Sequence, residues 1–466
     1  METNSSFLEK TFSLSERKTN AKTEFLAGLT TFMTMSYILV VNPNMLSETG
    51  MDKGGVFTAT IVASIIAMLF MGLFANLPFA LSAGMGLNAF FTYTVVLSMG
   101  HDWSYALTAV FLEGIIFIVM SLFNVREAIF TSIPMSLKNA VSVGIGLFIT
   151  LVGLISAGVI VDNDATLIAL GEIASRPSVV FIVSLMVMAL LTAKNVKGAL
   201  LYGIVTGTVL ALILGVTHLP GGMLFSLPPS LAPVAFKLHW GDLFTFDMFS
   251  VMFTFLFVDL FDTVGTLTGV ATKAGLIDED GNLPGVGRAL LSDAIGTVVG
   301  ALLGTSTVTT FVESASGVAD GGRTGLTSLS CAFFFLLSLF LFPIFSIVPA
   351  QATSAALVMV GLFMISPINQ IKLDDFTESV PAFLTMVTMP FAYSIAEGIS
   401  VGMISYVILK VATGRGKEVS PVMYILALIF TLRYLRPILP FWSLKTHLLN
   451  CLSPFSIIIY ILRGRF

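Results

Sequence analysis

The sequence predicts a polytopic α-helical membrane protein, as its composition, its apolar runs and the placement of its basic residues indicate. Of the 466 residues, 56% are hydrophobic and only 11% are charged, with a mean hydropathy of +0.96. A soluble chain of this length carries far more charge on its surface. Apolar runs such as 61–75 and 179–193 are, with their flanks, long enough to cross a hydrocarbon core about 30 Å thick as helices.

Fourteen spans are expected, and several of them are short or interrupted. They lie near residues 24–42, 57–75, 78–99, 104–123, 140–160, 177–193, 199–217, 248–272, 290–304, 306–320, 324–348, 352–370, 380–394 and 396–412. With the amino terminus inside, fifteen Lys and Arg residues fall at inner positions and three at outer positions. This asymmetry follows the positive-inside rule, so both termini are expected in the cytoplasm.

The amino-terminal end and the cysteines exclude several other classes. The first 22 residues are polar and contain four basic residues, so no signal peptide is expected. The two cysteines, Cys331 and Cys451, are neither a disulfide framework nor part of a clustered Cys/His motif. No metal and no cofactor are therefore expected.

The chain is organised as two halves of seven spans, separated by a long hydrophilic connection. The divisions are 1–22 as a cytoplasmic segment, 23–217 and 248–412 as the two repeats, 218–247 as the extracytoplasmic connection and 413–466 as a cytoplasmic tail. Because each half has an odd number of spans, the two halves have opposite orientations. Inverted halves of this kind are typical of secondary transporters.

The third span of each half contains a polar interruption rich in small residues. These are LSAGMGLNAFFTY at 81–93 and GTSTVTTFVE at 305–314. Unwound backbone at membrane depth is tolerated where it lines a cavity or is buried in protein, and paired interruptions indicate a binding site at the midplane. Close packing through small residues is the alternative. Asn88 and Glu313 within these segments favour a site, because polar and ionisable groups at this depth are rare without function.

A second polar cluster lies in FLFVDLFDTVGTLTG at 255–269. On a helix, Asp259, Asp262, Thr263 and Thr266 share one face. Burial disfavours the charged form of a carboxylate, so such a pair can couple proton binding to substrate binding. Hydrogen bonding between helices is the alternative, and it carries more weight for Asp259 than for Asp262. Two further acids, Glu113 and Glu397, are expected to be structural partners.

Three segments together resemble one family. DLFDTVGTLTG, TTFVESASG and LSAGMGLNAFF are similar to the signatures of the nucleobase–cation symporters, in particular the AzgA-like purine permeases, and the set looks closest to bacterial adenine permeases. The resemblance extends from about Ala21 to Leu435. It implies a fourteen-helix, seven-plus-seven inverted repeat with strand-like segments in spans 3 and 10. Spans 1–4 and 8–11 would form a core that moves against a gate formed by spans 5–7 and 12–14.

The resemblance also implies roles for individual residues. Asp262 and Glu313 match the carboxylates that contact the base, Phe311 an aromatic that stacks on it, and Asn88 a polar position of span 3. Asp293 matches an aspartate of span 9, and Thr266 stands where some relatives carry histidine. The substrate-binding candidates are Asp262, Glu313, Asn88, Phe311, Thr266 and Thr310; the candidates for proton coupling are Asp262, Glu313, Asp259 and Asp293.

These features predict a proton-coupled symporter that imports purine nucleobases, with adenine favoured, across a bacterial inner membrane. Guanine and hypoxanthine are the alternative substrates, and an anion transporter or channel of the same architecture is a more distant alternative that the two carboxylates disfavour. No nucleophile–base set, metal cluster or P-loop indicates an enzyme or an ATP-driven pump. The expected partners are the base, protons, the lipid bilayer and a second copy in a homodimer, but no nucleic acid.

The carboxyl-terminal sequence after Leu435 changes character. Its longest apolar run, 455–462, is too short to span a bilayer, and prolines break any long helix. Four basic residues, Trp442 and no acids suit the inner membrane surface. We expect these residues to lie on the cytoplasmic face and to contribute nothing to transport.

Overall fold

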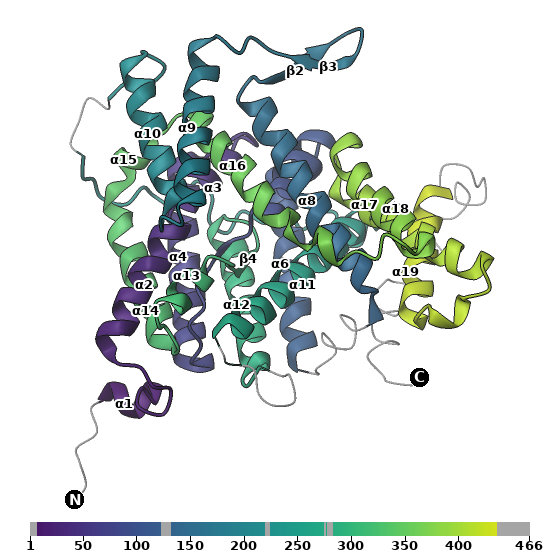
Figure 1. Cartoon of the computed structure of the whole chain (residues 1–466), viewed down its shortest axis with the longest axis horizontal. Helices are drawn as coiled ribbons and strands as arrows, with labels where there is room; N and C mark the ends of the chain where they lie inside the picture. Colours follow the sequence, from purple (N-terminus) through teal and green to yellow (C-terminus); the bar gives the residue numbers. More distant parts are fainter. Residues whose placement is uncertain (1–6, 123–131, 220–223, 275, 277–282, 436–466) are drawn as a thin grey trace, which may run out of the picture.

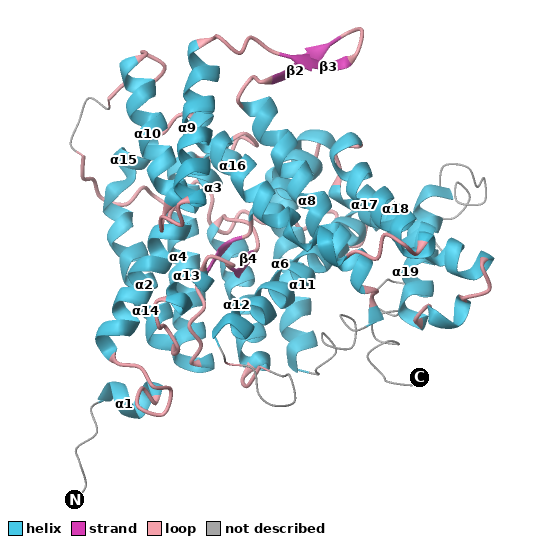
Figure 2. Ribbon diagram, viewed as in Figure 1, coloured by secondary structure: helices cyan, strands magenta, loops and turns pink. Residues whose placement is uncertain are grey.

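The computed structural model describes residues 7–122, 132–219, 224–274, 276 and 283–435. Most of the described chain, about 71%, is helical (Figures 1 and 2). Within these residues, nine helices are long and apolar enough to cross a membrane, and three apolar helices are shorter. The amino-terminal helix α1 (Phe7–Phe12) lies at one end of the bundle, called here the amino-terminal face, and the β2–β3 hairpin lies at the other.

The first half contains spans 1–7 in the expected order. Its elements are α2 (Ala21–Met35), α3 (Ile38–Ser47), α4 (Lys53–Phe70), the π-helical segment Met71–Ala75, β1 (Leu81–Ala83), α5 (Met85–Ala89), the π-helical segment Phe90–Ser98, α6 (Trp103–Leu122), α8 (Met135–Ser156), β2 (Ile160–Asn163), β3 (Leu167–Leu170), α9 (Arg176–Ala193) and α10 (Ala199–Ile213). The short hairpin formed by β2 and β3 joins spans 5 and 6, and the sequence analysis did not anticipate it.

The second half repeats this order. Its elements are α11 (Phe246–Ala274), α12 (Val286–Leu303), β4 (Val308–Thr310), α13 (Ser314–Ala319), α14 (Gly325–Ser338), the 3-10 turn Leu339–Leu341, α15 (Phe342–Ser346), α16 (Ala350–Ile365), the 3-10 turn Ser366–Gln370, α17 (Phe376–Phe391), α18 (Ile395–Ala412), the 3-10 turn Gly416–Glu418 and α19 (Pro421–Leu435).

Side-chain caps fix where several membrane helices begin. Asn20 accepts from the backbone N–H of Thr23 at the start of α2, and Asp52 accepts from Gly55 at the start of α4. Each cap satisfies an N–H group that has no partner inside its helix. Glu24 on α2 caps the start of another helix, α14. Its fully buried carboxylate accepts from the backbone N–H groups that begin α14, which joins span 1 to span 11.

The two interrupted spans meet at the centre of the bundle. Strand β1 pairs antiparallel with β4, and Ser82 lies opposite Thr309. The pairing continues where the backbone N–H of Phe311 donates to the carbonyl of Ala80. These bonds satisfy backbone groups that lipid could not. The strand-like segments expected in spans 3 and 10 are therefore confirmed, and Figure 2 shows β4 surrounded by helices.

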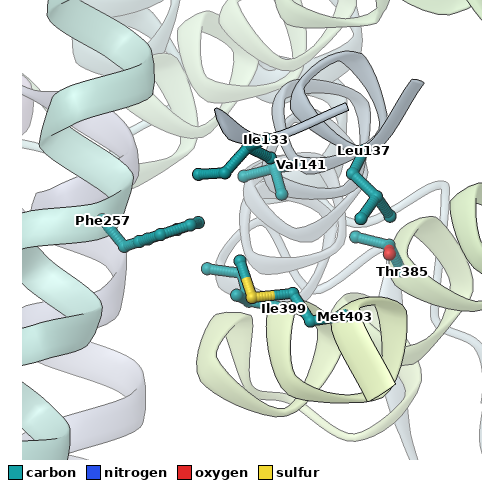
Figure 3. Close-up of a pocket in the computed structure, with 7 residues that line it drawn as sticks. All are labelled: Ile133, Leu137, Val141, Phe257, Thr385, Ile399 and Met403. Carbon is teal, nitrogen blue, oxygen red and sulfur yellow. The ribbon is translucent and has the colours of Figure 1, made fainter. Parts of the chain in front are cut away.

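The helices form two bundles. In the core, α2–α6 and α11–α14 pack on one another around the two strands; in the gate, α8–α10 and α16–α18 pack on one another. This arrangement confirms the expected seven-plus-seven inverted repeat with core and gate domains. A small apolar pocket lies on the boundary between α11 and the gate helices (Figure 3). Its lining residues are Ile133, Leu137, Val141, Phe257, Thr385, Ile399 and Met403.

The segment expected to begin the carboxyl-terminal tail contains a helix. The apolar helix α19 packs along α18, with Met423 and Phe430 buried. The phenol of Tyr434 contacts the carboxylate of Glu397 at the start of α18, so α19 runs antiparallel to α18. The sequence analysis missed α19 because its 15 residues are too few for an ordinary span. The expected surface segment, 436–466, lies outside the described residues.

Candidate functional site

The carboxylate of Asp262 lies halfway along α11, next to the start of α5. Its side chain is half-buried, and no hydrogen bond joins it to another described residue. A Cβ atom at Gly84, between β1 and α5, would lie 2.6 Å from Thr309 Cγ2 and 3.7 Å from Asp262 Oδ2. A side chain at this junction would therefore collide with Thr309, and glycine lets the backbone before α5 lie close to the carboxylate of Asp262.

The second carboxylate comes from the other interrupted span. Glu313 lies at the cap position of α13, three residues after β4, and its side chain is half-buried. Its Oε1 accepts a hydrogen bond of 2.9 Å from the hydroxyl of Tyr37. Glu313 is also close enough to Asp262 for their charges to interact. The sequence analysis named both acids as candidates. They are 51 positions apart in the chain, and the structure brings them close together.

Among the described residues, neither of these two acids has a basic partner. Within the described part of the chain, no lysine or arginine forms an ion pair with Asp262 or Glu313. Carboxylates so placed accept hydrogen bonds from N–H donors and repel anions. The site therefore suits a neutral or cationic ligand with N–H groups. The described residues also contain no group of His, Cys, Asp and Glu that could hold a metal ion.

A buried polar network lies behind this site. The hydroxyl of Thr263 lies 3.0 Å from Asp259 Oδ1, 3.1 Å from Asp293 Oδ2 and 2.7 Å from the hydroxyl of Thr309. Thr310 donates to the other oxygen of Asp293 at 3.4 Å. All five side chains are buried. The network joins α11, α12 and β4, so two proton-coupling candidates, Asp259 and Asp293, share one hydroxyl.

Two further polar side chains hold the segment that leads into β4. Asn88, a substrate-binding candidate, is fully buried, and its Oδ1 accepts from the hydroxyl of Ser306. Glu113 is also fully buried and accepts from the hydroxyl of Thr307 at 2.8 Å. Asn88 therefore joins the two interrupted spans to each other, and Glu113 ties span 4 to the second of them.

The remaining candidates lie close in sequence to the two acids. Phe311 follows β4 directly, and its side chain is 5% exposed. Thr266 is half-buried, one helical turn after Asp262 on α11. The structure thus places Asp262, Glu313 and Phe311 near the meeting point of α11 with the interruptions, and Thr266 one helical turn further along α11. It places Asp259, Asp293, Thr310 and Asn88 in hydrogen-bonded positions behind it.

Sequence reasoning missed Tyr37 as a functional candidate. Tyr37 ends the segment FMTMSY at 32–37, which the sequence analysis did not single out. The available signal was a tyrosine in the middle of an apolar span, because a buried phenol needs a hydrogen-bond partner. The sequence could not show that this partner is Glu313, which lies 276 positions further along.

The fold and the site define a membrane transporter of the core-and-gate type, with its polar site where two interrupted spans meet. The chain belongs to the nucleobase/ascorbate transporter family, because residues 22–401 match the family model described as "Permease family". This membership confirms that the protein is a transporter and not an enzyme.

Relatives align with the chain over most of its length. It is 50% identical to a protein named as a permease in Methanocaldococcus jannaschii, over 92% of this chain and 98% of the relative. It is 44% identical to the adenine permease AdeP of Escherichia coli, over 91% and 95%. It is 45% identical to the guanine/hypoxanthine permease PbuG of Bacillus subtilis, over 91% and 98%.

Solved structures of distant sequence have the same fold. The transmembrane domain of the cyanobacterial bicarbonate transporter BicA superposes with a TM-score of 0.61 at 16% identity, over 80% of this chain and 96% of that one. SLC26A9 superposes with a TM-score of 0.63 at 11% identity, over 84% and 65%. At these identities the likeness concerns the fold alone.

Proposed function

We propose that this protein is a symporter that imports purine nucleobases together with protons, and that adenine is its preferred substrate. The observation that carries this proposal is the pair Asp262 and Glu313, two half-buried acids that lie near each other where the interrupted spans meet and that pair with no described lysine or arginine. A purine is flat and carries N–H donors at its rim. Carboxylates accept from these donors, and Phe311 offers an aromatic face for stacking.

Adenine and the oxopurines differ in the donors that they offer to a carboxylate. The family motifs of this chain look closest to adenine permeases, and the exocyclic amine of adenine is a donor that a carboxylate can accept. Guanine and hypoxanthine are the second candidates, because PbuG is as similar to this chain as AdeP. Their ring N–H groups can also donate to a carboxylate.

Proton coupling is supported by the geometry around Thr263. One hydroxyl has one proton, so Thr263 can donate to Asp259 or to Asp293, but not to both at once. When both contacts are hydrogen bonds, one of the two acids must carry a proton and donate it to the hydroxyl. Two ionised carboxylates on one hydroxyl would repel each other in this dry environment. The network therefore holds one proton that Asp259 and Asp293 share through the Thr263 hydroxyl, and uptake or release of this proton changes the charge of the pair.

We place the protein in a bacterial inner membrane with its amino-terminal face on the cytoplasmic side, in line with the distribution of basic residues. The base binds between core and gate, and movement of the core against the gate exposes it to one side and then to the other. Because the network connects β4 to α11 and α12, a change in its protonation alters the segment that holds Phe311 and Glu313.

Uptake by proteoliposomes that contain the purified full-length chain tests this function. Labelled adenine should accumulate under an inward proton gradient and stop accumulating when a protonophore is added. Unlabelled adenine should compete more strongly than guanine or hypoxanthine. Stronger competition by guanine would support the second candidate, whereas uptake that follows a sodium gradient and ignores the protonophore would contradict proton coupling.

A further inference from the structure

Tyr37 occupies a third break in the core, beside the two interrupted spans. It lies between α2 and α3, where the first span turns at Ser36 and Tyr37 before the helix resumes. The backbone N–H of Val41 donates to the carbonyl of Tyr37, so the Tyr37 backbone forms the first turn of α3. The side chain is 1% exposed. Burial of a phenol in this position requires a partner for its hydroxyl.

That partner is Glu313, whose Oε1 accepts from the Tyr37 hydroxyl at 2.9 Å. A hydrogen bond to a carboxylate is stronger and more directional than one between neutral groups. Asp262 is also close enough for its charge to act on the phenol. Tyr37 therefore lies beside both acids of the proposed site, although it belongs to a span that carries neither.

We propose that Tyr37 is a positioning residue for substrate binding. Its hydroxyl holds one oxygen of Glu313 and so orients the other oxygen toward the base. A glutamate has three side-chain torsions, and fixing them before the base arrives lowers the entropy cost of binding. This role rests on the proposed function, because it assigns Tyr37 to the same purine site.

The positioning role predicts an effect on substrate binding rather than on folding or on the transport cycle. Tyr37→Phe removes one oxygen atom and keeps the ring that packs in the core. In proteoliposomes, the KM for adenine should rise roughly tenfold while the maximal rate changes by less than about twofold, as expected when a binding contact is lost.

Tyr93→Phe is the matched control. The hydroxyl of Tyr93 donates to the carboxylate of Glu48 at 3.2 Å, and Tyr93 is also buried. The substitution removes the same kind of hydrogen bond from another part of the core. It should leave the KM for adenine within about twofold of the wild type, since the described contacts of Tyr93, with Glu48 and Tyr393, include neither Asp262 nor Glu313.

A second measurement does not depend on the substrate. Dicyclohexylcarbodiimide modifies buried carboxyl groups, and peptide mass spectrometry locates the modification. Release of Oε1 in Tyr37→Phe should speed labelling of Glu313 severalfold, whereas Tyr93→Phe should not change it. An unchanged KM together with unchanged labelling would overturn the positioning role. Failure of Tyr37→Phe to fold would also overturn it, because the residue would then be structural.

The outcome for Tyr37 can be distinguished from a failure of the proposed function. If the wild-type protein took up no purine, the proposed function would be wrong. The labelling comparison would still decide whether Tyr37 holds Glu313, because it needs only the folded protein.

Discussion

The ammonium group of Lys197 contacts the carboxylate of Asp320, and this ion pair joins the gate to the core at the amino-terminal face. Lys197 lies in the turn between α9 and α10, and Asp320 follows α13, the helix whose cap position is Glu313. The hydroxyl of Thr30 on α2 also donates to Asp320, at 2.7 Å. The contact therefore links the end of span 10 to a gate hairpin.

Breaking this ion pair should change the transport rate only modestly. Both side chains are partly exposed, and exposed ion pairs contribute about 1 kcal/mol or less. Lys197→Gln should therefore alter the maximal uptake rate by less than about fivefold and leave the KM for the base nearly unchanged. The charge-reversed pair, Lys197→Asp with Asp320→Lys, should restore the rate. A large change in KM would show instead that the pair acts on the site itself.

The two acids of the proposed site should be indispensable. Asp262→Asn and Glu313→Gln keep the shape of each side chain but replace an acceptor oxygen with a donor amide. Each should reduce uptake of labelled adenine at least about a hundredfold while leaving the protein folded in the membrane. Asp162→Asn, in the exposed hairpin strand β2, is the control and should transport normally. Wild-type uptake by either site variant would remove that residue from the site.

The hydroxyl of Thr263 should be required for coupling to protons. Thr263→Val keeps the volume of the side chain but leaves Asp259 and Asp293 without the shared hydroxyl. Uptake driven by a proton gradient should fall at least tenfold. Exchange of labelled for unlabelled base, which needs no net proton movement, should fall less. Thr263→Ser keeps the hydroxyl and should retain most of the driven uptake; equal losses in both variants would contradict this account.

The ionic cluster at the end of the gate should not contribute to the pH dependence of transport. Hydrogen bonds from Arg415 and Lys410 lower the pKa of Glu418 to about 2, and those from Thr377 and Arg415 lower the pKa of Asp375 to about 2. Because both values lie below those of the unfolded chain, about 4, the stabilisation is complete above about pH 5 and is lost as the pH falls toward 2.

The variant Arg415→Gln tests the direction of this pH dependence. The melting temperature in detergent should fall by the same small amount, at most a few degrees, at pH 5.5 and at pH 7.5. A difference between wild type and variant that changed across this interval would show that other groups titrate with the cluster. Any change in wild-type uptake between these pH values must then come from elsewhere in the chain.

Two truncations should distinguish the contribution of α19 from that of the residues that follow it. Ending the chain after Leu435 should leave uptake within about twofold of the full chain, because no described span or site residue is removed. Ending it after Ser420 should lower the melting temperature, because it removes the buried side chains of Met423 and Phe430 from the surface of α18. Loss of transport in the first truncation, with normal membrane insertion, would assign a role to 436–466.

The sequence by itself determined the class of protein, the order of the spans and the two interruptions. Hydropathy and residue spacing are properties of short segments, and a bilayer imposes the same length and polarity on every helix that crosses it. Asp262 and Glu313 could be identified for the same reason, since an acid in an apolar span stands out without knowledge of its neighbours.

Only the tertiary structure decided which polar groups meet. Tyr37 and Glu313 are 276 positions apart, and Asn88 and Ser306 are 218 apart. Their contacts depend on how spans from opposite halves pack around β1 and β4. The same holds for Asp259 and Asp293, which share Thr263 behind the site. A one-dimensional pattern records which side chains are polar, but packing in three dimensions determines which of them donates to which, because a hydrogen bond forms only at short range and in a favourable direction.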